Sequence, residues 1–368
     1  MGCKSGTLEN LVSSRMLSQL HAFKGKKVLV TGHTGFKGTW MSRILVLAGA
    51  EVHGLALSPE LGSIFSRIEN LGLQSSTILD IRDRKEVDKY FCHNKFDGVF
   101  HLAAQPIVLK SYEEPVETFE TNVMGTAHLL DSIINNKSAE WVLVITTDKV
   151  YKNIEVQEGY CEEDALGGKD PYSASKSATE MVVEAWRSIA EFKKSKVVLC
   201  TARAGNVIGG GDVAKDRLIP DLIRSFYANA PAVIRNPNSL RPWQHVLDPI
   251  SGYLRIGERL LHQKSVATAY NFGPGDESRL NVEGMAKVAC TLWEGSKGYV
   301  INSEVLRPPE AVLLWLSSER AQHDLGWKNK LDATTAIEWT INWERESHEA
   351  NAKTATDSQI KEYFEGVA

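Results

Sequence analysis

Two short stretches of the chain carry residue types that could move protons on a substrate. Tyr172 and Lys176 are four residues apart, so they share one face of the helix that opens at Pro171. An ammonium beside a phenol stabilises the phenolate, and the tyrosine can then accept a hydroxyl proton near neutral pH. Thr147, in the second stretch, could hydrogen-bond the same hydroxyl. Together these side chains could deprotonate a substrate alcohol.

Asp148 and Lys149 follow Thr147 directly and could extend this chemistry to the loss of water. Elimination requires a positioned acid and a positioned base, and these two residues are candidates for the two roles. A lysine with an ordinary pKa is mostly protonated and cannot act as a base. Lys149 therefore needs burial or the neighbouring Lys176 charge to lower its pKa. The alternative interpretation is that Lys149 contacts a phosphate or the solvent.

A glycine-rich turn could hold a cofactor beside these residues. Gly32, Gly35 and Gly38 have G-x-x-G-x-x-G spacing, between an apolar run of strand type at 26–30 and a helix at 39–49. Glycine lets the backbone approach a pyrophosphate closely, and the N-terminus of the following helix offers free N–H groups. The strand–turn–helix context favours a dinucleotide site over the alternative of a plain turn.

Short apolar strands alternate with helices through the first half of the chain. This order predicts an α/β fold, a Rossmann-type doubly wound parallel sheet whose ligands bind at the carboxyl ends of the strands. Asn122 falls inside a long helix that precedes the last of these strands, and Asp83–His93 reads as a charged surface helix. The expected later strands are Glu51–Leu57, Ser76–Leu79, Gly98–Leu102 and Trp141–Ile145.

The ends of the second and third strands bear on the choice of nucleotide. Ser58 stands where Asp or Glu often binds the ribose hydroxyls, and it does not repel a 2′-phosphate. This position therefore leaves NAD and NADP open. Asp80 and Ile81 could contact an adenine, although an aspartate at this place also suits a helix N-cap. Arg67 reads as a surface arginine.

The whole chain has 368 residues and a net charge of −4, which gives no reason to expect nucleic-acid binding. No apolar run approaches the length of a membrane span. Five cysteines, without a C-x-x-C pair, favour reduced thiols in a cytoplasmic protein. There is no cluster of cysteine and histidine typical of a metal site, and we expect no metal.

Several ordered motifs resemble the extended short-chain dehydrogenase/reductase family, and within it the group of CDP-glucose 4,6-dehydratases. The resemblance extends from about residue 23 to residue 344. The motifs are TGHTGFKG at 31–38, HLAAQP at 101–106, TTDK at 146–149, DPYSASK at 170–176, TARAGNVIGGGD at 201–212, DRLIPDLIR at 216–224, RPWQHV at 241–246 and NFGP at 271–274.

This resemblance implies an NAD-containing homodimer or homotetramer that converts CDP-glucose to CDP-4-dehydro-6-deoxyglucose. Related dehydratases carry Asp-Glu where this chain has Asp148-Lys149, and Asp-Lys is typical of the CDP-glucose group. It implies substrate contacts at Gln105, Asn206, Arg217 and Arg241. It implies cofactor contacts at Gly32, Thr34, Gly35, Phe36, Lys37, Gly38, Ser58, Asp80, Ile81, Leu102, Ala103, Ala104, Asn122, Tyr172 and Lys176.

The later part of the chain predicts a smaller, discontinuous α/β lobe for the substrate. A strand at 270–273, after a helix at about 249–262, should return to the main sheet. We expect an extension at 1–24, the NAD domain at 25–206 plus 242–273, the substrate lobe at 207–241 plus 274–350, and a tail at 351–368 that frays. In the extension, one side of a short helix could carry Leu8, Leu11, Val12, Leu20 and Phe23.

Other residues of this region receive structural interpretations. Gly209–Gly211 suggests a mobile loop, His245 a core residue, and Arg224 and Arg235 salt bridges. Four tryptophans should pack the smaller lobe: Trp315, Trp327, Trp339 and Trp343.

Two other functional hypotheses remain open. One is a 4-epimerase, or a dehydratase for another nucleotide, with the same fold. The other is a non-catalytic dinucleotide-binding protein, which would have no need of Thr147, Asp148, Tyr172 and Lys176.

Overall fold

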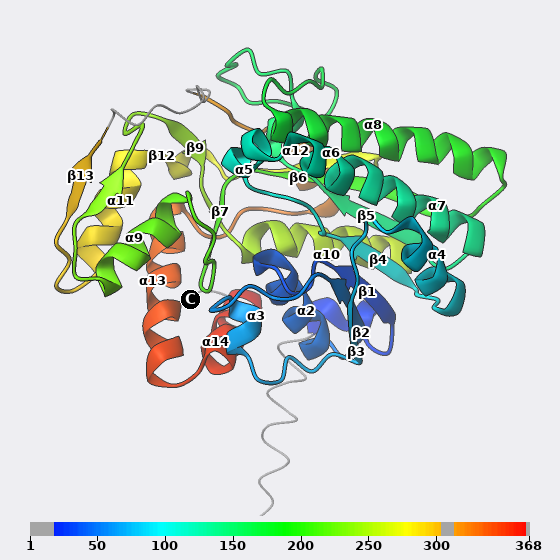
Figure 1. Cartoon of the computed structure of the whole chain (residues 1–368), viewed down its shortest axis with the longest axis horizontal. Helices are drawn as coiled ribbons and strands as arrows, with labels where there is room; N and C mark the ends of the chain where they lie inside the picture. The colour runs from blue at the N-terminus through cyan, green and yellow to red at the C-terminus, as the bar shows by residue number, and fades with distance from the viewer. Residues whose placement is uncertain (1–17, 303–312, 366–368) are drawn as a thin grey trace, which may run out of the picture.

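A seven-stranded parallel sheet forms the centre of the molecule (Figure 1). The computed structural model describes residues 18–302 and 313–365. All neighbouring strands in this sheet run parallel. In spatial order they are β11 (Ala269–Phe272), β6 (Val198–Ala204), β5 (Trp141–Ile145), β4 (Gly98–His101), β1 (Lys27–Thr31), β2 (Glu51–Ala56) and β3 (Ser75–Ile78).

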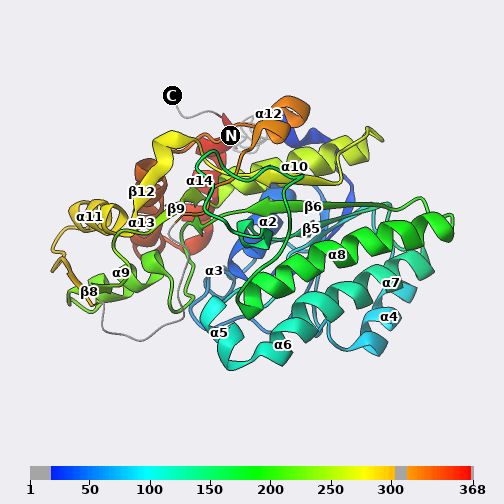
Figure 2. The same cartoon turned by 90° about the horizontal axis from the view of Figure 1, so that it is seen from above.

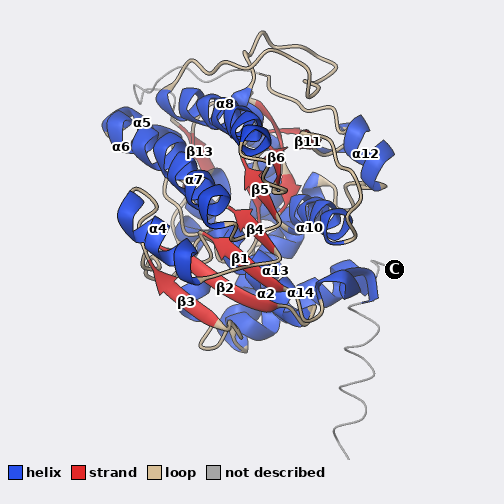
Figure 3. Ribbon diagram, turned by 90° about the vertical axis from the view of Figure 1, so that its right-hand side faces the viewer, coloured by secondary structure: helices blue, strands red, loops and turns tan. Residues whose placement is uncertain are grey.

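Helices cover both faces of the sheet, which confirms the doubly wound α/β prediction (Figure 3). Alternate residues of a strand point to opposite faces. Val28 and Val30 accordingly pack in one core cluster, whereas Leu29 packs in another. Helices α2 (Phe36–Leu47) and α10 (Leu247–Leu261) cover the first face, and α4 (Arg84–His93), α7 (Thr126–Asn136) and α8 (Pro171–Phe192) cover the second. No helix in the described parts of the chain has the length and apolarity that a bilayer span requires.

The helix expected around Asn122 is divided into segments. A π-helical turn, Glu120–Gly125, lies between α6 (Pro115–Phe119) and α7, and α5 (Val108–Glu113) precedes α6. A π turn adds one residue to the helical repeat and is common near functional sites. Asn122 lies inside this turn and is buried, which is consistent with its predicted place in the cofactor site.

A smaller lobe stands beside the sheet, on the left of Figure 1. Its own core includes residues of α9 (Leu218–Tyr227), α11 (Val282–Leu292) and α13 (Ala333–Glu349). Its strands form short pairs: β8 (Ala232–Ile234) with β13 (Tyr299–Ile301), and β9 (Leu240–Pro242) with β12 (Arg279–Asn281). A further pair, β7 (Val207–Ile208) with β10 (Gln244–His245), leads into α10.

Helix α13 serves both cores, and this corrects the expected role of the tryptophans. Ile337 and Ile341 pack in the smaller lobe, whereas Trp339 and Trp343 pack in the main core. Trp327 also belongs to the main core, where it contacts Phe272 edge-on. These tryptophans join the sheet to the C-terminal part of the chain, rather than filling the smaller lobe.

The end of the chain is a packed helix, so the prediction that it frays was wrong for residues 352–365. Helix α14 (Ala352–Glu365) buries Ile360, Tyr363 and Phe364 in the main core. Its Asp357 accepts hydrogen bonds from the Arg43 guanidinium at 2.5 and 2.6 Å. Several of the polar residues that suggested fraying lie on the outer face of this helix, whereas Thr356 and Gln359 are buried.

The glycine run Gly209–Gly211 is clamped rather than a free loop. A Cβ on Gly210 would lie 2.0 Å from the Trp343 ring, so glycine permits this close approach. The Gly210 carbonyl accepts a hydrogen bond from Trp40 Nε1 at 3.1 Å, and the Gly211 N–H donates to Glu344 at 2.9 Å. These contacts fix the segment after β7 against α13.

Two short helices complete the frame, α3 (Ile64–Arg67) and α12 (Glu319–Leu325). At the start of the described chain, a 3₁₀ helix (Ser18–Phe23) buries Leu20 and Phe23, as the sequence suggested. Arg67 is not a free surface residue, because it donates to Glu344 at 3.1 Å and lies over the Trp343 ring. The other apolar residues of the expected N-terminal helix, Leu8, Leu11 and Val12, lie outside the described residues.

Candidate active site

The end of β5 presents Thr147 and Asp148 at the carboxyl edge of the sheet. The chain leaves β5 at Ile145 and enters a 3₁₀ turn, Asp148–Val150, in which Thr147 is the N-cap. The Thr147 hydroxyl donates to Asp148 Oδ1 at 2.8 Å, and Asp148 Oδ2 is buried without a hydrogen-bond partner. Burial raises the pKa of Asp148, and the charge of Lys149 opposes this shift most strongly. Asp148 is thus a carboxyl group that favours its protonated form more than an exposed aspartate does.

Helix α8 places Tyr172 against the same strand end. Asp170 caps the helix by accepting from the Ser173 N–H at 2.9 Å, and Pro171 occupies the first turn. Tyr172 is hydrogen-bonded to Thr147. Burial raises the pKa of Tyr172 to about 12, while this hydrogen bond and the charge of Arg217 oppose the shift. Thr147 therefore contacts both Asp148 and Tyr172.

Lys176 lies one turn further along α8 and is 5% exposed. Its Nζ donates to the Ile145 carbonyl at the end of β5, at 3.1 Å. Burial lowers the pKa of Lys176 to about 8, and Glu180 opposes that shift. The structure thus brings Thr147, Asp148, Tyr172 and Lys176 together from two elements. Half-buried Lys149 stands beside them, with its backbone N–H 3.4 Å from the Thr147 hydroxyl.

The glycine-rich turn has the shape that a pyrophosphate requires. Gly32 has a φ of +72°, and a Cβ on it would lie 2.8 Å from the Ala103 nitrogen. A Cβ on Gly38 would lie 2.0 Å from the Gly32 carbonyl oxygen. Gly35 is exposed at the start of α2, where no side chain caps the helix. The first N–H groups of α2 are therefore available to an anionic ligand.

Lys37 projects from this turn towards the Tyr172 cluster. Burial lowers its pKa to about 7, and the charges of Arg217 and Lys176 lower it further. The Asp148 carboxyl acts in the opposite direction. The sequence placed Lys37 among cofactor contacts but did not indicate that it stands so close to Asp148.

The other predicted cofactor residues have different surroundings. Asp80 accepts from the Arg82 guanidinium at 2.6 and 2.9 Å, so its carboxylate already has a cationic partner. Ile81 is buried, and Ser58 is exposed. The Thr34 hydroxyl donates to the Leu57 carbonyl at 2.9 Å. Phe36, Leu102, Ala103 and Ala104 are partly buried around the turn.

Asn122 and Gln105 form an internal hydrogen-bond network beside this turn. Asn122 Oδ1 accepts from the Gln105 N–H at 2.8 Å, and Asn122 Nδ2 donates to Ser175 Oγ at 2.9 Å. The Gln105 side chain in turn donates to Thr118 and Ile107. Gln105, a predicted substrate contact, is therefore largely engaged in holding the backbone of its own loop.

Two arginines face the cluster from the smaller lobe. Arg217 donates to Asp212 at 2.9 Å, and its charge acts on Tyr172 and Lys37. Arg241 is buried, and its charge lowers the pKa of Asp148. Asn206, half-buried, precedes β7, and its carbonyl accepts from the Gln244 N–H at 3.0 Å.

Three further sequence interpretations concern residues outside the cluster. Arg224 and Arg235 form ion pairs with Asp221 and Asp216, as expected. His245 is fully buried between the Trp40 and Trp339 rings, which confirms the expected core position, and burial lowers its pKa to about 3.

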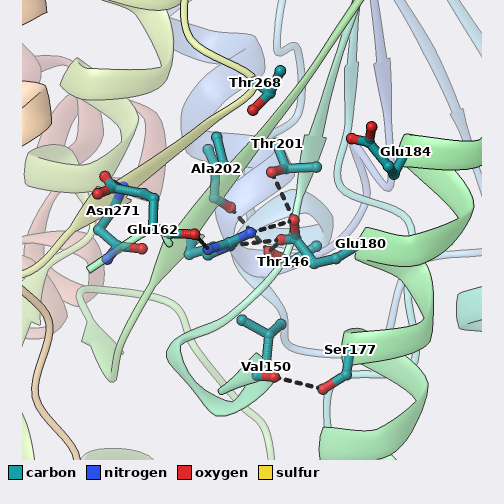
Figure 4. A network of polar contacts seen from close by, with 12 residues as sticks. Thr146, Val150, Glu162, Ser177, Glu180, Glu184, Thr201, Ala202, Thr268 and Asn271 are labelled. Carbon is teal, nitrogen blue, oxygen red and sulfur yellow. Dashed lines mark hydrogen bonds and ion pairs between the residues drawn. The ribbon is translucent and has the colours of Figure 1, made fainter. Parts of the chain in front are cut away.

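Sequence reasoning missed a buried carboxylate directly behind the cluster. Glu180 follows Lys176 by one turn of α8 and pairs with Arg203 of β6 at 2.9 Å (Figure 4). The available signal was its i+4 spacing from Lys176, which places both on one helical face. Its partners come from β5 and β6, so the spacing alone does not reveal them.

Comparison with known proteins gives one family match and related folds. Residues 29–340 match the model of the GDP-mannose 4,6-dehydratase family. The chain is 44% identical over 329 residues to the CDP-glucose 4,6-dehydratase of Salmonella typhimurium, covering 88% of this chain and 91% of that one. Epimerase Mth375 of Methanothermobacter thermautotrophicus has a TM-score of 0.78 at 23% identity, with coverage of 93% and 98%. DesIV, a dTDP-glucose 4,6-dehydratase of Streptomyces venezuelae solved with NAD bound, has a TM-score of 0.73 at 21% identity, with coverage of 88% and 98%.

Proposed function

Because this chain belongs to the GDP-mannose 4,6-dehydratase family, we propose that it removes water from CDP-glucose to give CDP-4-dehydro-6-deoxyglucose. One observation carries the choice of dehydration: the buried Asp148 carboxyl stands beside Thr147 and Tyr172 with a raised pKa. An epimerase oxidises and reduces a single carbon and needs no acid for a leaving hydroxyl. The identity to the Salmonella enzyme supports CDP-glucose as the substrate.

NAD is the cofactor of this proposal, and the glycine turn fits it. The open Gly35 position and the uncapped N-terminus of α2 suit a pyrophosphate. When bound, NAD supplies the acceptor for hydrogen from C4 and the donor that returns it to C6, so no net reductant is consumed. Lys37 would add positive charge beside the phosphates, and Lys176 and Asn122 would lie towards the nicotinamide half. Ser58, Asp80 and Ile81 would lie towards the adenosine half.

Tyr172 is the proposed base for the C4 hydroxyl. Its phenolate oxygen would accept the hydroxyl proton while Thr147 hydrogen-bonds the same oxygen. The pKa of about 12 must fall for this step, so nearby positive charge is needed. The charge of Arg217 already acts on Tyr172 in this direction, and Lys176, one turn further along α8, would supply the second cation.

Asp148 and Lys149 act after oxidation in this proposal. A ketone at C4 makes the C5 proton acidic, because its loss gives an enolate. Protonated Asp148 would donate its proton to the departing C6 hydroxyl, and Lys149 would remove the C5 proton directly or through water. The raised pKa of Asp148 supports its role as the acid.

The substrate pyrophosphate would bind between the two lobes. Arg217 and Arg241 present guanidinium groups on this side, and Asn206 offers an amide. Gln105 would contribute by holding the backbone of its loop beside the substrate. We retain the proposed division into an NAD domain, at 25–206 plus 242–273, and a substrate lobe, at 207–241 plus 274–350.

We also propose a homodimer or homotetramer and a cytoplasmic location. Apolar side chains are exposed along α5, α6, the π turn and α8, which lie together on one side of the molecule (Figure 2). Such a surface is typical of subunit contacts. The exposed residues are Tyr112, Val116, Phe119, Met124 and Met181. The exposed thiols of Cys92 and Cys161 support a reducing compartment.

Incubation with a panel of nucleotide-glucoses, followed by mass spectrometry, tests the proposed reaction. CDP-glucose should lose one water and gain the absorbance of a 4-keto sugar. An epimer of unchanged mass, or dehydration of a different nucleotide-glucose only, would contradict the proposal. Denaturing the purified protein and identifying the released nucleotide tests the cofactor, since finding only NADP would exclude NAD.

A further inference from the structure

Glu180 has a fully occupied carboxylate in the interior behind the active-site cluster. Its side chain is 4% exposed and accepts four hydrogen bonds (Figure 4). Thr146 and Thr201 donate from two neighbouring strands at 2.5 and 2.8 Å. Arg203 donates twice, at 2.9 and 3.1 Å. Charge-assisted bonds of this kind favour the carboxylate, and they lower the pKa of Glu180 despite its burial.

These bonds connect the two elements that carry the catalytic residues. Thr146 immediately precedes Thr147 at the end of β5, and its backbone N–H also bonds the Ala202 carbonyl of β6 at 2.9 Å. Glu180 lies on α8, one turn after Lys176 and two turns after Tyr172. The Glu180–Thr146 bond therefore fixes the distance between the helix and the strand end that the proposed mechanism requires.

Glu180 also lies one helical turn from Lys176, and its negative charge favours the ammonium form of that lysine. The groups acting on Lys176 are Glu180 on its own helix, His101 from β4 and Lys37 from α2. His101 is buried and its pKa is lowered to about 3, so it is neutral. Lys37 carries a like charge when protonated, and the Arg203 charge lies beyond Glu180. Glu180 alone among these groups favours the charged form of Lys176.

We propose that Glu180 is a positioning residue that holds Thr147 against Tyr172 and keeps Lys176 positively charged for the oxidation of C4. This inference rests on the proposed function. Loss of the Lys176 charge would raise the barrier to deprotonation by Tyr172, because the phenolate would lose a cation. The positive charge of Arg203 compensates the negative charge of the Glu180 carboxylate, so Glu180 can stay ionised in the interior.

Glu180→Gln tests the charge, and Glu184→Gln is the matched control. Glu184 lies one turn further along α8 and also pairs with an arginine, Arg187, but it is exposed and remote from Lys176. The first readout is the lysine ¹⁵Nζ NMR titration of the apo protein, with the Lys176 signal assigned by Lys176→Arg. We expect Glu180→Gln to lower the Lys176 midpoint by about one pH unit or more. Glu184→Gln should leave it unchanged.

The second readout is the pH profile of C4 oxidation. Glu180→Gln should move the alkaline limb to lower pH by the same shift, because Lys176 loses its proton earlier. A structural role alone would lower the rate at every pH without moving the limb. Thr146→Val, which keeps the charge, should lower the rate at every pH and leave the Lys176 titration unchanged.

Glu180→Gln leaves Arg203 buried without its counter-ion, which can prevent folding. The double variant Glu180→Gln/Arg203→Gln removes both charges and gives the same expectation for Lys176. An unchanged Lys176 midpoint in whichever of these variants folds would overturn the inference. Absence of dehydration by the wild-type protein would contradict the proposed function instead, and the NMR titration would still decide the role of Glu180.

Discussion

Two clusters in this molecule contain the same kinds of side chain but differ in their surroundings. Each has an aspartate, a tyrosine, a lysine and a small hydroxyl residue. The proposed active-site cluster, here called the active-site cluster, consists of Thr147, Asp148, Tyr172 and Lys176, which are all buried. The second, here the core cluster, consists of Asp248, Ser251, Lys330 and Tyr363, where α10 meets α14.

Hydrogen bonds in the core cluster join one structural element to another. The Tyr363 hydroxyl donates to Asp248 Oδ1 at 2.8 Å, and the Lys330 N–H donates to the same oxygen at 2.8 Å. Lys330 Nζ donates to the Tyr363 carbonyl at 2.9 Å. The cluster thereby fastens α14 to the first turns of α10.

The active-site cluster is distinguished by its position and its charged neighbours. Burial raises the pKa of Asp148 and also raises that of Asp248, to about 7. A carboxyl group with a raised pKa therefore does not by itself mark the reaction centre. Asp148 lies at a strand end opposite a glycine turn, with Lys149, Arg241 and Lys37 around it. Position therefore separates the two clusters better than residue type does, because Asp148 follows the end of a strand whereas Asp248 lies in helix α10.

Changing the two tyrosines in the same way gives the largest expected contrast. Tyr172→Phe removes the proton acceptor but keeps the packing of the ring. We expect C4 oxidation to fall by at least about 100-fold, measured as reduction of bound NAD in a single turnover, with substrate binding nearly intact. Tyr363→Phe should retain wild-type oxidation. Oxidation by Tyr172→Phe at more than about a hundredth of the wild-type rate would exclude Tyr172 as the base.

The two aspartates give the next contrast. Asp148→Asn should still reduce NAD when substrate is added but should stall before water is lost, because the acid for the C6 hydroxyl is missing. Asp248→Asn should dehydrate normally once folded. For the wild type, turnover in heavy water should place one deuterium at C5 and none at C6 from solvent, read by NMR of the product. Solvent deuterium at C6, or full activity in both Asp148→Asn and Lys149→Ala, would contradict these assignments.

Stability should depend on pH through the core cluster. Because burial raises the pKa of Asp248 to about 7, the folded protein holds this proton more tightly than the unfolded chain. The stabilisation that this proton gives the folded state is complete below about pH 4, and it is lost as pH rises through about 7. Asp248→Asn should flatten this slope by up to about 1.4 kcal/mol per pH unit. Urea unfolding at several pH values measures the slope, and parallel curves for the two proteins would refute the assignment.

The smallest expected effect is the stability change of Tyr363→Phe. Loss of its hydrogen bond to Asp248 should destabilise the protein by about 1 kcal/mol at neutral pH. The midpoint of urea unfolding should therefore fall, while Tyr172→Phe, with its hydroxyl in an active site, should change the midpoint less. Equal midpoints for Tyr363→Phe and wild type would show that this hydroxyl does not fasten α14.

Much of the frame could be predicted from the sequence because local signals determine it. Trp141–Ile145 forms a strand with the expected bounds, since it is a short β-rich run followed by polar residues at its end. Thr147 was predicted from its position after a strand end, and Tyr172 from its four-residue spacing to Lys176 on one helix. The surface helix predicted at Asp83–His93 is α4, which begins at Arg84 with Asp83 as its N-cap.

The missed features depend on contacts between residues far apart in sequence. The glycine run around Gly210 suggested a mobile loop, but Trp343, more than a hundred residues later, packs directly on the Gly210 backbone. Helix α14 looked like a polar tail because its buried face is only half of the helix, and that face packs on α13 and also contacts α2 and α10. The role of Glu180 likewise depends on Arg203 and Thr201, which α8 cannot reveal by its own pattern.

The sharing of one core by both ends of the chain has a consequence for synthesis on the ribosome. Trp40 and Phe23 pack in the same core cluster as Trp343, Tyr363 and Phe364. The ribosome releases the chain from its N-terminus, so the nucleotide-binding half emerges first with an apolar face that α13 and α14 have yet to cover. Those helices leave the exit tunnel only after that half. The core of the nucleotide-binding half therefore stays incomplete until α13 and α14 have been synthesised. A nascent chain stopped before residue 343 would expose that apolar face to chaperones.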